Sequence, residues 1–181
     1  FQPRTLNTID SYGKIDVSTV ITKSSNVGAS KIALSLEPEQ YWDALNRFGF
    51  GHSTGSGYPG ESSGSLNSFN TWSEIEMATL SFGYGLSVTP LQLVHAYSIL
   101  ATGGVMLPVS FIKINGSVTG KRVMPENITR QVRKMLETVV SANGTGKRAA
   151  IKGYRVIGKT GTVHKSIRGG YSDDRYLSIF A

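Results

Sequence analysis

The chain has no cysteine among its 181 residues, which excludes disulfide scaffolds, thiol nucleophiles and metal sites with cysteine ligands. It also lacks an apolar run near the ~18 residues that a membrane-spanning helix needs, and no signal peptide opens it. Charged residues are few, at 17%, and the net charge of +7 is expected to be spread without a block of one sign. Such a pattern is typical of a solvated surface, although it would also attract anionic substrates or lipid headgroups. With 39% hydrophobic residues, the composition is globular rather than disordered.

Three segments show the apolar spacing of amphipathic helices, with proline or threonine at the start and glycine after the end. They are residues 38–48, 89–102 and 125–141. A weaker helix is expected to follow Ser24-Ser25-Asn26. Residues 49–70, which are rich in Gly, Ser and Asn, are expected to form a loop.

Shorter segments have the composition of strands, at residues 109–114, 154–163 and 176–181. The glycines at 169 and 170 predict a hairpin turn between the last two. Two strands alone are marginally stable in water, and the apolar helix faces need a sheet to cover. The sequence therefore predicts an α/β chain of the α+β type, with an antiparallel sheet flanked by helices, cut at both ends from a larger domain.

The most specific local motif is Lys-Thr-Gly-Thr at residues 159–162. In a strand, Lys159 and Gly161 share one face, and a glycine lets a ligand lie against the backbone. The Lys159 cation and the hydroxyls of Thr160 and Thr162 could bind a carboxylate. This combination favours an extended peptide with a free carboxylate docked along a strand edge. The alternative is an edge strand with a solubilising lysine.

The same lysine lies in a match to the phosphate-binding loop, Gly-x-x-x-x-Gly-Lys-Thr, over residues 153–160. That loop needs a helix after it, whereas the residues that follow have no helical pattern. Residues 154–157 are also bulky, which makes a poor cradle for phosphates. A nucleotide-binding protein is therefore the remote alternative, and an ATP-binding assay would test it.

A second motif, Ser-x-Asn, is formed by Ser24 and Asn26. It combines a hydroxyl that can pass a proton with an amide that both donates and accepts hydrogen bonds. Alone it means little, because serine and asparagine are common helix N-caps. Lys159 follows Ser24 by 135 residues, so only the fold could give the two motifs a joint role.

Ser-x-Asn and Lys-Thr-Gly are two of the three motifs that mark penicillin-binding proteins and serine β-lactamases. Further stretches resemble class B penicillin-binding proteins in the same order, so the resemblance covers roughly residues 17–181. They are Lys-Ser-Ser-Asn-Val-Gly-Ala-Ser-Lys at 23–31, Gly-Tyr-Pro-Gly-Glu at 57–61, Phe-Gly-Tyr-Gly-Leu-Ser-Val-Thr-Pro-Leu-Gln-Leu at 82–93, and Ile-Lys-Gly-Tyr at 151–154.

The third motif, Ser-x-x-Lys, carries the nucleophilic serine of that family and precedes Ser-x-Asn. The chain has two matches. The match at Ser110 follows Ser-x-Asn, which is the wrong order. The match at Ser11 lies only 13 residues before Ser24 and contains Gly13, which would weaken a helix. Neither fits, so the nucleophile and its lysine are expected to precede Phe1.

The resemblance implies the penicillin-binding transpeptidase fold, which serine β-lactamases share. It also implies acyl transfer through a serine ester, from D-Ala-D-Ala stem peptides of peptidoglycan to the amine of a second stem peptide. β-Lactams mimic the donor and stall as acyl-enzyme. No metal or organic cofactor is implied.

For the residues present, the resemblance implies distinct roles. Ser24 would relay protons, Asn26 would hydrogen-bond the donor amide and the missing catalytic lysine, and Lys159 would hold the electrostatics of the site. Thr160 and Thr162 would bind the donor carboxylate, and the Thr162 N–H would complete the oxyanion hole.

The resemblance also implies that residues 1–181 are part of a transpeptidase domain, with a pedestal and an inner-membrane anchor outside this chain and the domain facing the periplasm. Implied partners are the stem peptides, β-lactams, and a septal glycan polymerase with other division proteins; nucleic acid is not expected. A β-lactam-sensing or β-lactam-hydrolysing relative would share the short motifs. Residues 83–92 favour the class B synthase instead.

Overall fold

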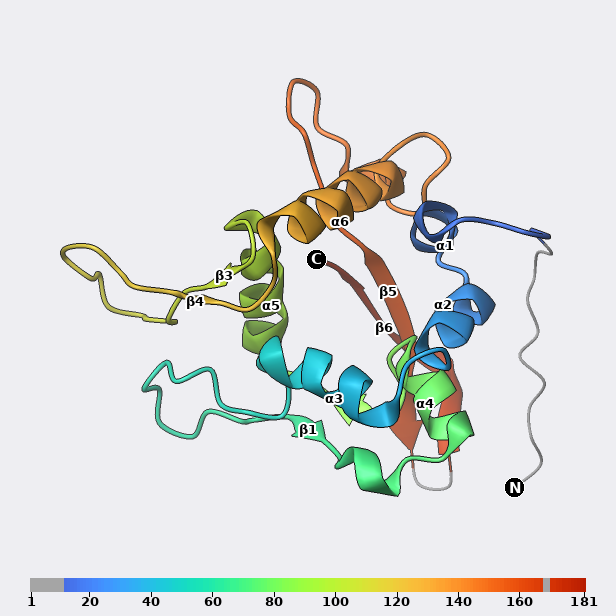
Figure 1. Cartoon of the computed structure of the whole chain (residues 1–181), viewed down its shortest axis with the longest axis horizontal. Coiled ribbons are helices and arrows are strands. Elements are labelled where there is room, and N and C mark those ends of the chain that lie inside the picture. Colours follow the sequence, from blue (N-terminus) through green and yellow to red (C-terminus); the bar gives the residue numbers. More distant parts are fainter. Residues whose placement is uncertain (1–11, 168–169) are drawn as a thin grey trace. The chain divides into compact units, whose positions relative to one another are not determined.

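The computed structural model describes residues 12–167 and 170–181 (Figure 1). The chain divides into two compact units. Within the described residues, unit 1 consists of residues 26–132, and unit 2 consists of residues 12–25 together with residues 133–181.

The elements of unit 1 are α2 (Asn26–Ala33), α3 (Pro38–Arg47), β1 (Ser65–Leu66), the 3₁₀ turn η1 (Phe69–Thr71), α4 (Glu74–Leu80), β2 (Leu86–Ser87), α5 (Pro90–Ala101), β3 (Val105–Met106) and β4 (Lys121–Arg122). Helix α6 (Glu126–Val139) begins in unit 1 and ends in unit 2. Unit 2 also contains α1 (Val17–Lys23), the 3₁₀ turn η2 (Lys147–Ala149), β5 (Thr160–Ile167) and β6 (Gly170–Phe180). The strands form three antiparallel pairs, β1 with β2, β3 with β4 and β5 with β6.

The predicted helices are confirmed, and α5 shows why their ends could be located. The Thr89 hydroxyl accepts a hydrogen bond from the Gln92 N–H at 3.1 Å, and Pro90 occupies the first turn. After the helix, Gly103 and Gly104 both adopt positive φ. At Gly104 a side chain is also excluded by space, because a Cβ would lie 2.1 Å from a backbone oxygen.

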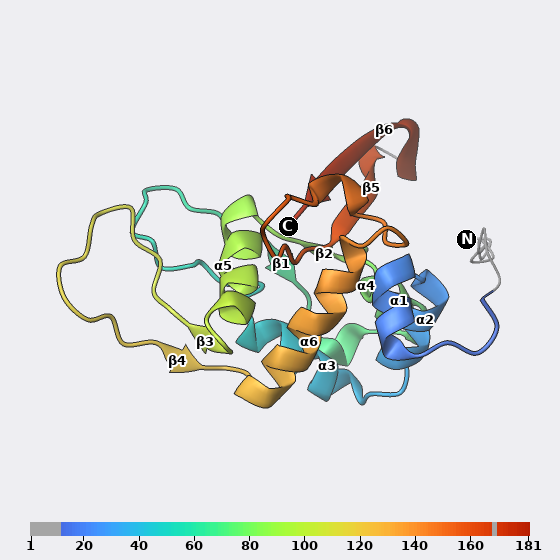
Figure 2. The ribbon, with the colours of Figure 1, turned by 90° about the horizontal axis from the view of Figure 1, so that it is seen from above.

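Helix α2, the weaker expected helix, packs against α4 in unit 1 (Figures 1 and 2). The buried Ser30 hydroxyl donates to the Ala78 carbonyl of α4 at 3.2 Å. Apolar side chains of α4 and α5 are buried in the same unit, among them Met77, Leu80 and Ile99. In unit 1, α2 and α4 thus cover each other, while α5 packs against β3 and α3 against η1.

A buried glutamine attaches a long loop to α5. Gln92 is only 2% exposed, and its side-chain amide donates to the carbonyls of His52 and Ser63, both at 2.7 Å. Its oxygen accepts from the Thr89 N–H at 2.8 Å, so the amide is satisfied on both sides. This glutamine of the 82–93 stretch therefore has a structural role, because it holds both ends of the loop that carries residues 57–61.

Glu61 organises the interior of that loop. Its carboxylate accepts hydrogen bonds from the N–H and hydroxyl of Thr54, at 2.6 and 2.7 Å, and from those of Ser56, at 3.3 and 2.7 Å. The Ser56 hydroxyl, followed by Thr54, lowers the pKa of Glu61 to about 2. These bonds favour the ionised form, so their contribution to stability is present above the ordinary glutamate pKa and is lost as the pH falls towards 2.

Unit 2 combines α1, the end of α6 and the β5–β6 hairpin. Asp16 caps the start of helix α1, and its side chain accepts a hydrogen bond from the Thr19 N–H at 2.8 Å. The hydroxyls of Thr22 and Thr138 hydrogen-bond α1 to α6. The buried apolar side chains of this unit include Val20, Leu136, Val139 and Val140.

Two strand predictions need correction. Residues 109–114 form an irregular loop in which Ile112 is 81% exposed, because no neighbouring strand of the described chain pairs with it. In the segment 154–163, only the part from Thr160 onward is a strand. The hairpin turn expected at 169 and 170 includes Gly169, which lies outside the described residues.

Helices α1 and α4 are absent from the sequence-based prediction. Both carry local start signals. Asp16 caps α1, and Ser73 with Glu76 forms a capping box at the start of α4. Within the two described ranges, no helix combines the length and the apolarity that crossing a bilayer requires.

Candidate active site

Ser24 ends helix α1 in a backbone conformation that residues other than glycine rarely adopt. Its φ of 55° and ψ of 46° lie in the left-handed region, and the Ser25 N–H donates back to the Val20 carbonyl at 3.0 Å. Every other positive φ in the described chain belongs to a glycine. Because glycine suits such a cap better, a serine here indicates a role for its hydroxyl.

Lys159 brings the second motif to Ser24 within unit 2. Its backbone pairs with Ala181 beyond β6, with its N–H donating at 2.7 Å and the return bond measuring 3.2 Å. Its Nζ donates to Ser24 Oγ at 2.8 Å and to the Thr160 carbonyl at 2.9 Å. The fold therefore joins two motifs that are 135 residues apart in the sequence.

Partial burial lowers the pKa of Lys159, because desolvation disfavours the ammonium form. Among the described residues, no carboxylate lies within ion-pair distance of its Nζ to offset this effect. Since Ser24 Oγ accepts from Lys159, its own O–H can donate to another group. The pair can therefore pass a proton from the lysine through the serine to a bound molecule.

Strand β5 offers an open edge beside Lys159. Among the described strands, it pairs with β6 alone, in a two-stranded sheet. In the register of this hairpin, Thr160 lies opposite Phe180, Gly161 lies opposite Ile179 and Thr162 lies opposite Ser178. The second edge of β5 has no strand partner in the described part of the chain, so an extended peptide can pair there.

Gly161 is not required by the backbone. It lies in regular register with Ile179 without positive φ, and the register shift of the hairpin falls later, between His164 and Ser166. An added Cβ would lie 3.1 Å from Cγ1 of Ile179, whose side chain is 45% exposed and can move aside. Neither a turn nor a bulge therefore accounts for this glycine. The remaining reason for a glycine in a strand is the close approach of a ligand to the backbone.

The other predicted residues occupy different surroundings. Thr160 Oγ1 hydrogen-bonds Thr145 Oγ1 at 2.8 Å, while Thr162 is exposed. Asn26 is exposed at the start of α2, and its carbonyl accepts from the Ser30 hydroxyl at 2.9 Å. The hydrogen bonds of unit 2 thus join Ser24, Lys159 and Thr160, whereas Asn26 belongs to unit 1. None of the sequence motifs predicted that Thr145 would contact Thr160.

The competing motifs lack the local structure that their chemistry needs. Residues 153–160 lead into strand β5 instead of a helix, unlike a phosphate-binding loop. Ser110 lies in an exposed loop, where its hydroxyl donates to the Ile112 carbonyl at 2.7 Å and accepts from the Ile112 N–H at 3.1 Å. Ser11 lies outside the described residues. In the part of the chain described, no group of three His, Asp or Glu side chains is placed to hold a metal ion.

Comparison with known proteins decides the family. The sequence profile of the penicillin-binding protein transpeptidase domain matches residues 4–181. The chain belongs to this family. It is 40% identical to a probable peptidoglycan D,D-transpeptidase PenA of Neisseria flavescens, over 98% of this chain and 44% of that protein. It is 44% identical to the peptidoglycan D,D-transpeptidase FtsI of Escherichia coli, over 94% of this chain and 29% of that protein. The chain therefore spans less than half the length of these relatives.

Solved structures of the family confirm the expected fold. The transpeptidase domain of Burkholderia pseudomallei penicillin-binding protein 3 matches with a TM-score of 0.91 and 43% identity, over 95% of this chain and 53% of that one. Penicillin-binding protein 3 of Mycobacterium tuberculosis, in complex with aztreonam, matches with a TM-score of 0.80 and 37% identity, over 91% of this chain and 41% of that one. The likeness to class B penicillin-binding proteins, and to penicillin-binding protein 3 among them, is thereby confirmed.

The backbone of Ser24 leads to a prediction that separates strain from chemistry. Ser24→Gly and Ser24→Ala both remove the hydroxyl, but only glycine relieves the left-handed conformation. We expect Ser24→Gly to be about 1 kcal/mol more stable to urea than Ser24→Ala. Both variants of the full-length protein should lose at least ~10²-fold in acylation by a fluorescent penicillin, if the hydroxyl relays protons. If Ser24→Gly were less stable than Ser24→Ala, the backbone of Ser24 would not be strained. Unchanged acylation would contradict the proton relay through its hydroxyl.

Proposed function

We propose that the full-length protein is a peptidoglycan D,D-transpeptidase that cross-links stem peptides during septal wall synthesis and is acylated by β-lactams. The observation that carries this proposal is the 2.8 Å hydrogen bond from Lys159 Nζ to Ser24 Oγ, beside the open edge of β5, in a chain of the transpeptidase family. A cation, a hydroxyl that relays protons and a free strand edge suit a donor peptide that ends in a carboxylate.

The donor would pair with the open edge of β5 as an additional strand. Its terminal D-Ala carboxylate would meet the hydroxyls of Thr160 and Thr162 and the positive charge of Lys159. Gly161, between the two threonines, would leave room for the peptide against the backbone. The Asn26 side-chain amide would hydrogen-bond the donor amide and the lysine of Ser-x-x-Lys.

Acylation would begin when the hydroxyl oxygen of the nucleophilic serine attacks the carbonyl between the two D-Ala residues and its proton passes to the neutral lysine of Ser-x-x-Lys. The developing oxyanion would be held by the Thr162 N–H and by the N–H of the nucleophile itself. The C–N bond then breaks, and D-Ala leaves as an amine that takes a proton from the Ser24 hydroxyl. Lys159, with its lowered pKa, returns a proton to Ser24. The amine of a second stem peptide then attacks the ester, releases the serine and forms the cross-link.

The nucleophile itself would belong to a Ser-x-x-Lys motif outside residues 1–181. The test is to label the full-length protein with a fluorescent penicillin and map the modified peptide by mass spectrometry. We expect one adduct per molecule, on a serine that is neither Ser11 nor Ser110. An adduct on either of these would contradict the assignment of the nucleophile. No adduct at all would contradict the transpeptidase, and rapid turnover without a lasting adduct would favour a β-lactam-hydrolysing relative.

Location and assembly would follow the same function. We propose that the domain faces the periplasm, held at the inner membrane by a segment outside residues 1–181. It would act beside a septal glycan polymerase and other division proteins, since cross-linking needs newly made glycan strands. The family and the names of its relatives support this placement.

A further inference from the structure

The net charge of the chain is concentrated in one segment. Residues 138–172 contain seven Lys and Arg and no Asp or Glu, while the rest of the chain has twelve of each sign. The expectation of an evenly spread charge is therefore wrong. A basic segment of this kind sets up an attraction for acidic molecules.

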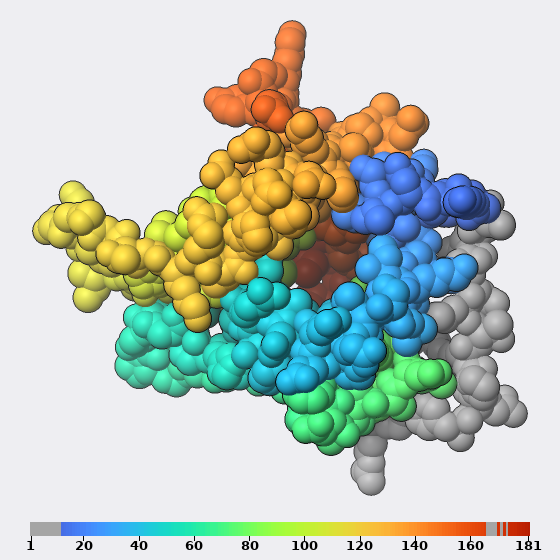
Figure 3. All heavy atoms as spheres, viewed as in Figure 1, coloured from blue at the N-terminus to red at the C-terminus, as the bar shows by residue number. Residues whose placement is uncertain are grey.

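Besides Lys159 of the candidate active site, four of these cations lie on the loop that joins α6 to β5. Lys147, Arg148, Lys152 and Arg155 are all exposed. Figure 3 shows this loop, in orange, standing out beyond α6 at the edge of unit 2. Arg155 forms an ion pair with Glu137 of α6 at 2.5 Å, which ties the end of the loop to the helix.

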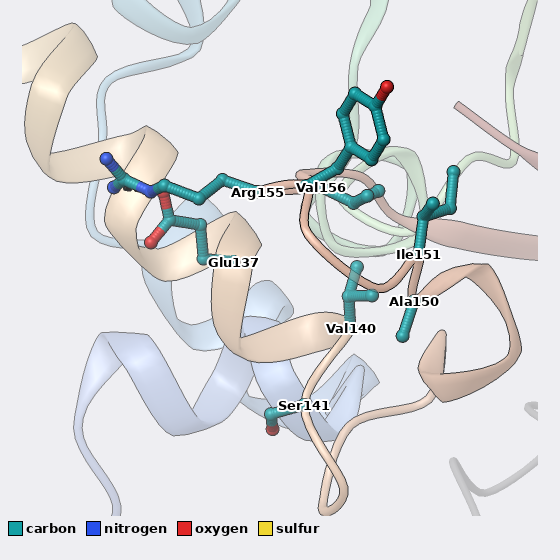
Figure 4. A pocket seen from close by; sticks show the side chains of 8 residues that line it. Glu137, Val140, Ser141, Ala150, Ile151, Arg155 and Val156 are labelled. Atoms are coloured by element: carbon teal, nitrogen blue, oxygen red, sulfur yellow. Dashed lines mark hydrogen bonds and ion pairs between the residues drawn. The ribbon is translucent and has the colours of Figure 1, made fainter.

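A groove of about 240 Å³ lies between this loop and the end of α6 (Figure 4). Its lining is partly apolar, with Val140 directly after α6 and Ala150, Ile151, Tyr154 and Val156 from the loop, and partly polar, with Glu137, Ser141 and Arg155. Ile151 is 58% exposed and Tyr154, at the rim, is 76% exposed, although both are large and hydrophobic. The volume is below the ~300–1,000 Å³ of small-molecule pockets, and it suits a single apolar side chain better than a whole ligand.

The loop is held in place by its own backbone. The Gly146 N–H donates to the Val139 carbonyl at 2.8 Å, which attaches the start of the loop to the end of α6. At the tip, the Tyr154 N–H donates to the Ile151 carbonyl at 3.1 Å, and Gly153 supplies the positive φ that this turn needs. A partner would therefore meet a preformed surface, which reduces the entropy lost on binding.

We infer that this basic groove, formed by the lining residues together with Lys147, Arg148 and Lys152, docks an acidic segment of a partner protein. One apolar side chain of that segment would enter the groove, and Asp or Glu residues on either side would face the three lysine and arginine side chains. Charge complementarity selects this occupant, because the exposed cations of the loop attract an acidic segment and repel a basic one. A lipid surface would contact the exposed tips but would not fill a recess.

The experiment uses the full-length protein and an array of synthetic peptides, each with one central leucine, phenylalanine or tryptophan flanked by glutamates. We expect at least one member to bind, more weakly at high salt. The double variant Lys147→Glu/Lys152→Glu should weaken that binding roughly tenfold or more. Ile151→Ser should weaken it roughly fivefold through the lost apolar contact. Lys113→Glu/Lys121→Glu, an equal charge change at two exposed lysines of unit 1, is the matched control and should change it less than twofold.

Acylation by a fluorescent penicillin should be the same in all four proteins, which separates this inference from the proposed function. Four results would overturn the inference. The first is that no glutamate peptide binds, and the second is that a peptide with serine in place of the apolar residue binds equally well. The third is that Lys113→Glu/Lys121→Glu weakens binding as much as Lys147→Glu/Lys152→Glu does. The fourth is that vesicles of phosphatidylglycerol and phosphatidylcholine bind through these residues while the peptides do not. The last result would assign the surface to a membrane.

Discussion

Lys159→Ala is expected to slow the acylation of the full-length protein by a β-lactam at least ~10²-fold, as when one preorganised electrostatic group is removed. The ammonium donates to Ser24 at 2.8 Å and to the Thr160 carbonyl at 2.9 Å, and alanine replaces neither bond. Second-order acylation rates with a fluorescent penicillin measure the effect. Thr160→Ser keeps the hydroxyl and serves as the mild control. A rate near that of the wild type for Lys159→Ala would leave this lysine with only a structural role.

The lowered pKa of Lys159 provides a second readout of the same prediction. Below the lowered pKa the buried ammonium costs stability, and that cost disappears as the pH rises to the ordinary lysine value. Lys159→Met keeps the apolar stem without the charge, so its melting temperature at neutral pH should hold or rise while acylation falls. Lys159→Arg stays charged to higher pH, so any alkaline loss of acylation in the wild type should move upward. A large drop in the melting temperature of Lys159→Met would contradict this account.

Gly161→Val is expected to abolish measurable acylation while the protein stays folded. Valine suits a strand, and its Cβ would require only a small shift of the half-exposed Ile179 side chain. On the face of β5 that it shares with Lys159, the same side chain would occupy the space that the donor or a β-lactam needs. Thermal melts and acylation rates on one sample of the full-length variant measure both effects. A large drop in melting temperature, with normal acylation in the surviving folded protein, would show that the glycine serves packing instead.

Gly158 offers the matched control for this experiment. A Cβ at Gly158 would lie 2.4 Å from Cζ of Phe180 and 2.7 Å from the Ala181 carbonyl oxygen. Gly158→Ala should therefore lower the melting temperature, although alanine is smaller than valine. The two glycines lie three residues apart and are required for opposite reasons. Only the packing around each glycine reveals this difference.

Helices with complete end signals are predictable from the sequence because their caps and apolar spacing are local. Thr89, Pro90 and the two glycines at 103 and 104 locate α5 within one residue. Helix α1 is harder to predict, because its β-branched residues resemble a strand and only Asp16 marks its start. The segment 109–114 has the composition of a strand but remains a loop, because a strand needs a partner that composition cannot supply.

The sequence by itself determined the family of this protein and the residue types of its candidate site. The proposed proton relay and carboxylate-binding strand require particular side chains, and the motifs that carry them occur along this chain in the order typical of the family. Only the tertiary structure decided that Lys159 meets Ser24, that Ser24 is strained and that the lysine pKa is lowered. It likewise decided that a partly apolar groove lies between the end of α6 and the loop that carries the exposed cations. Such properties depend on contacts and desolvation between segments far apart in the sequence, which no local pattern encodes.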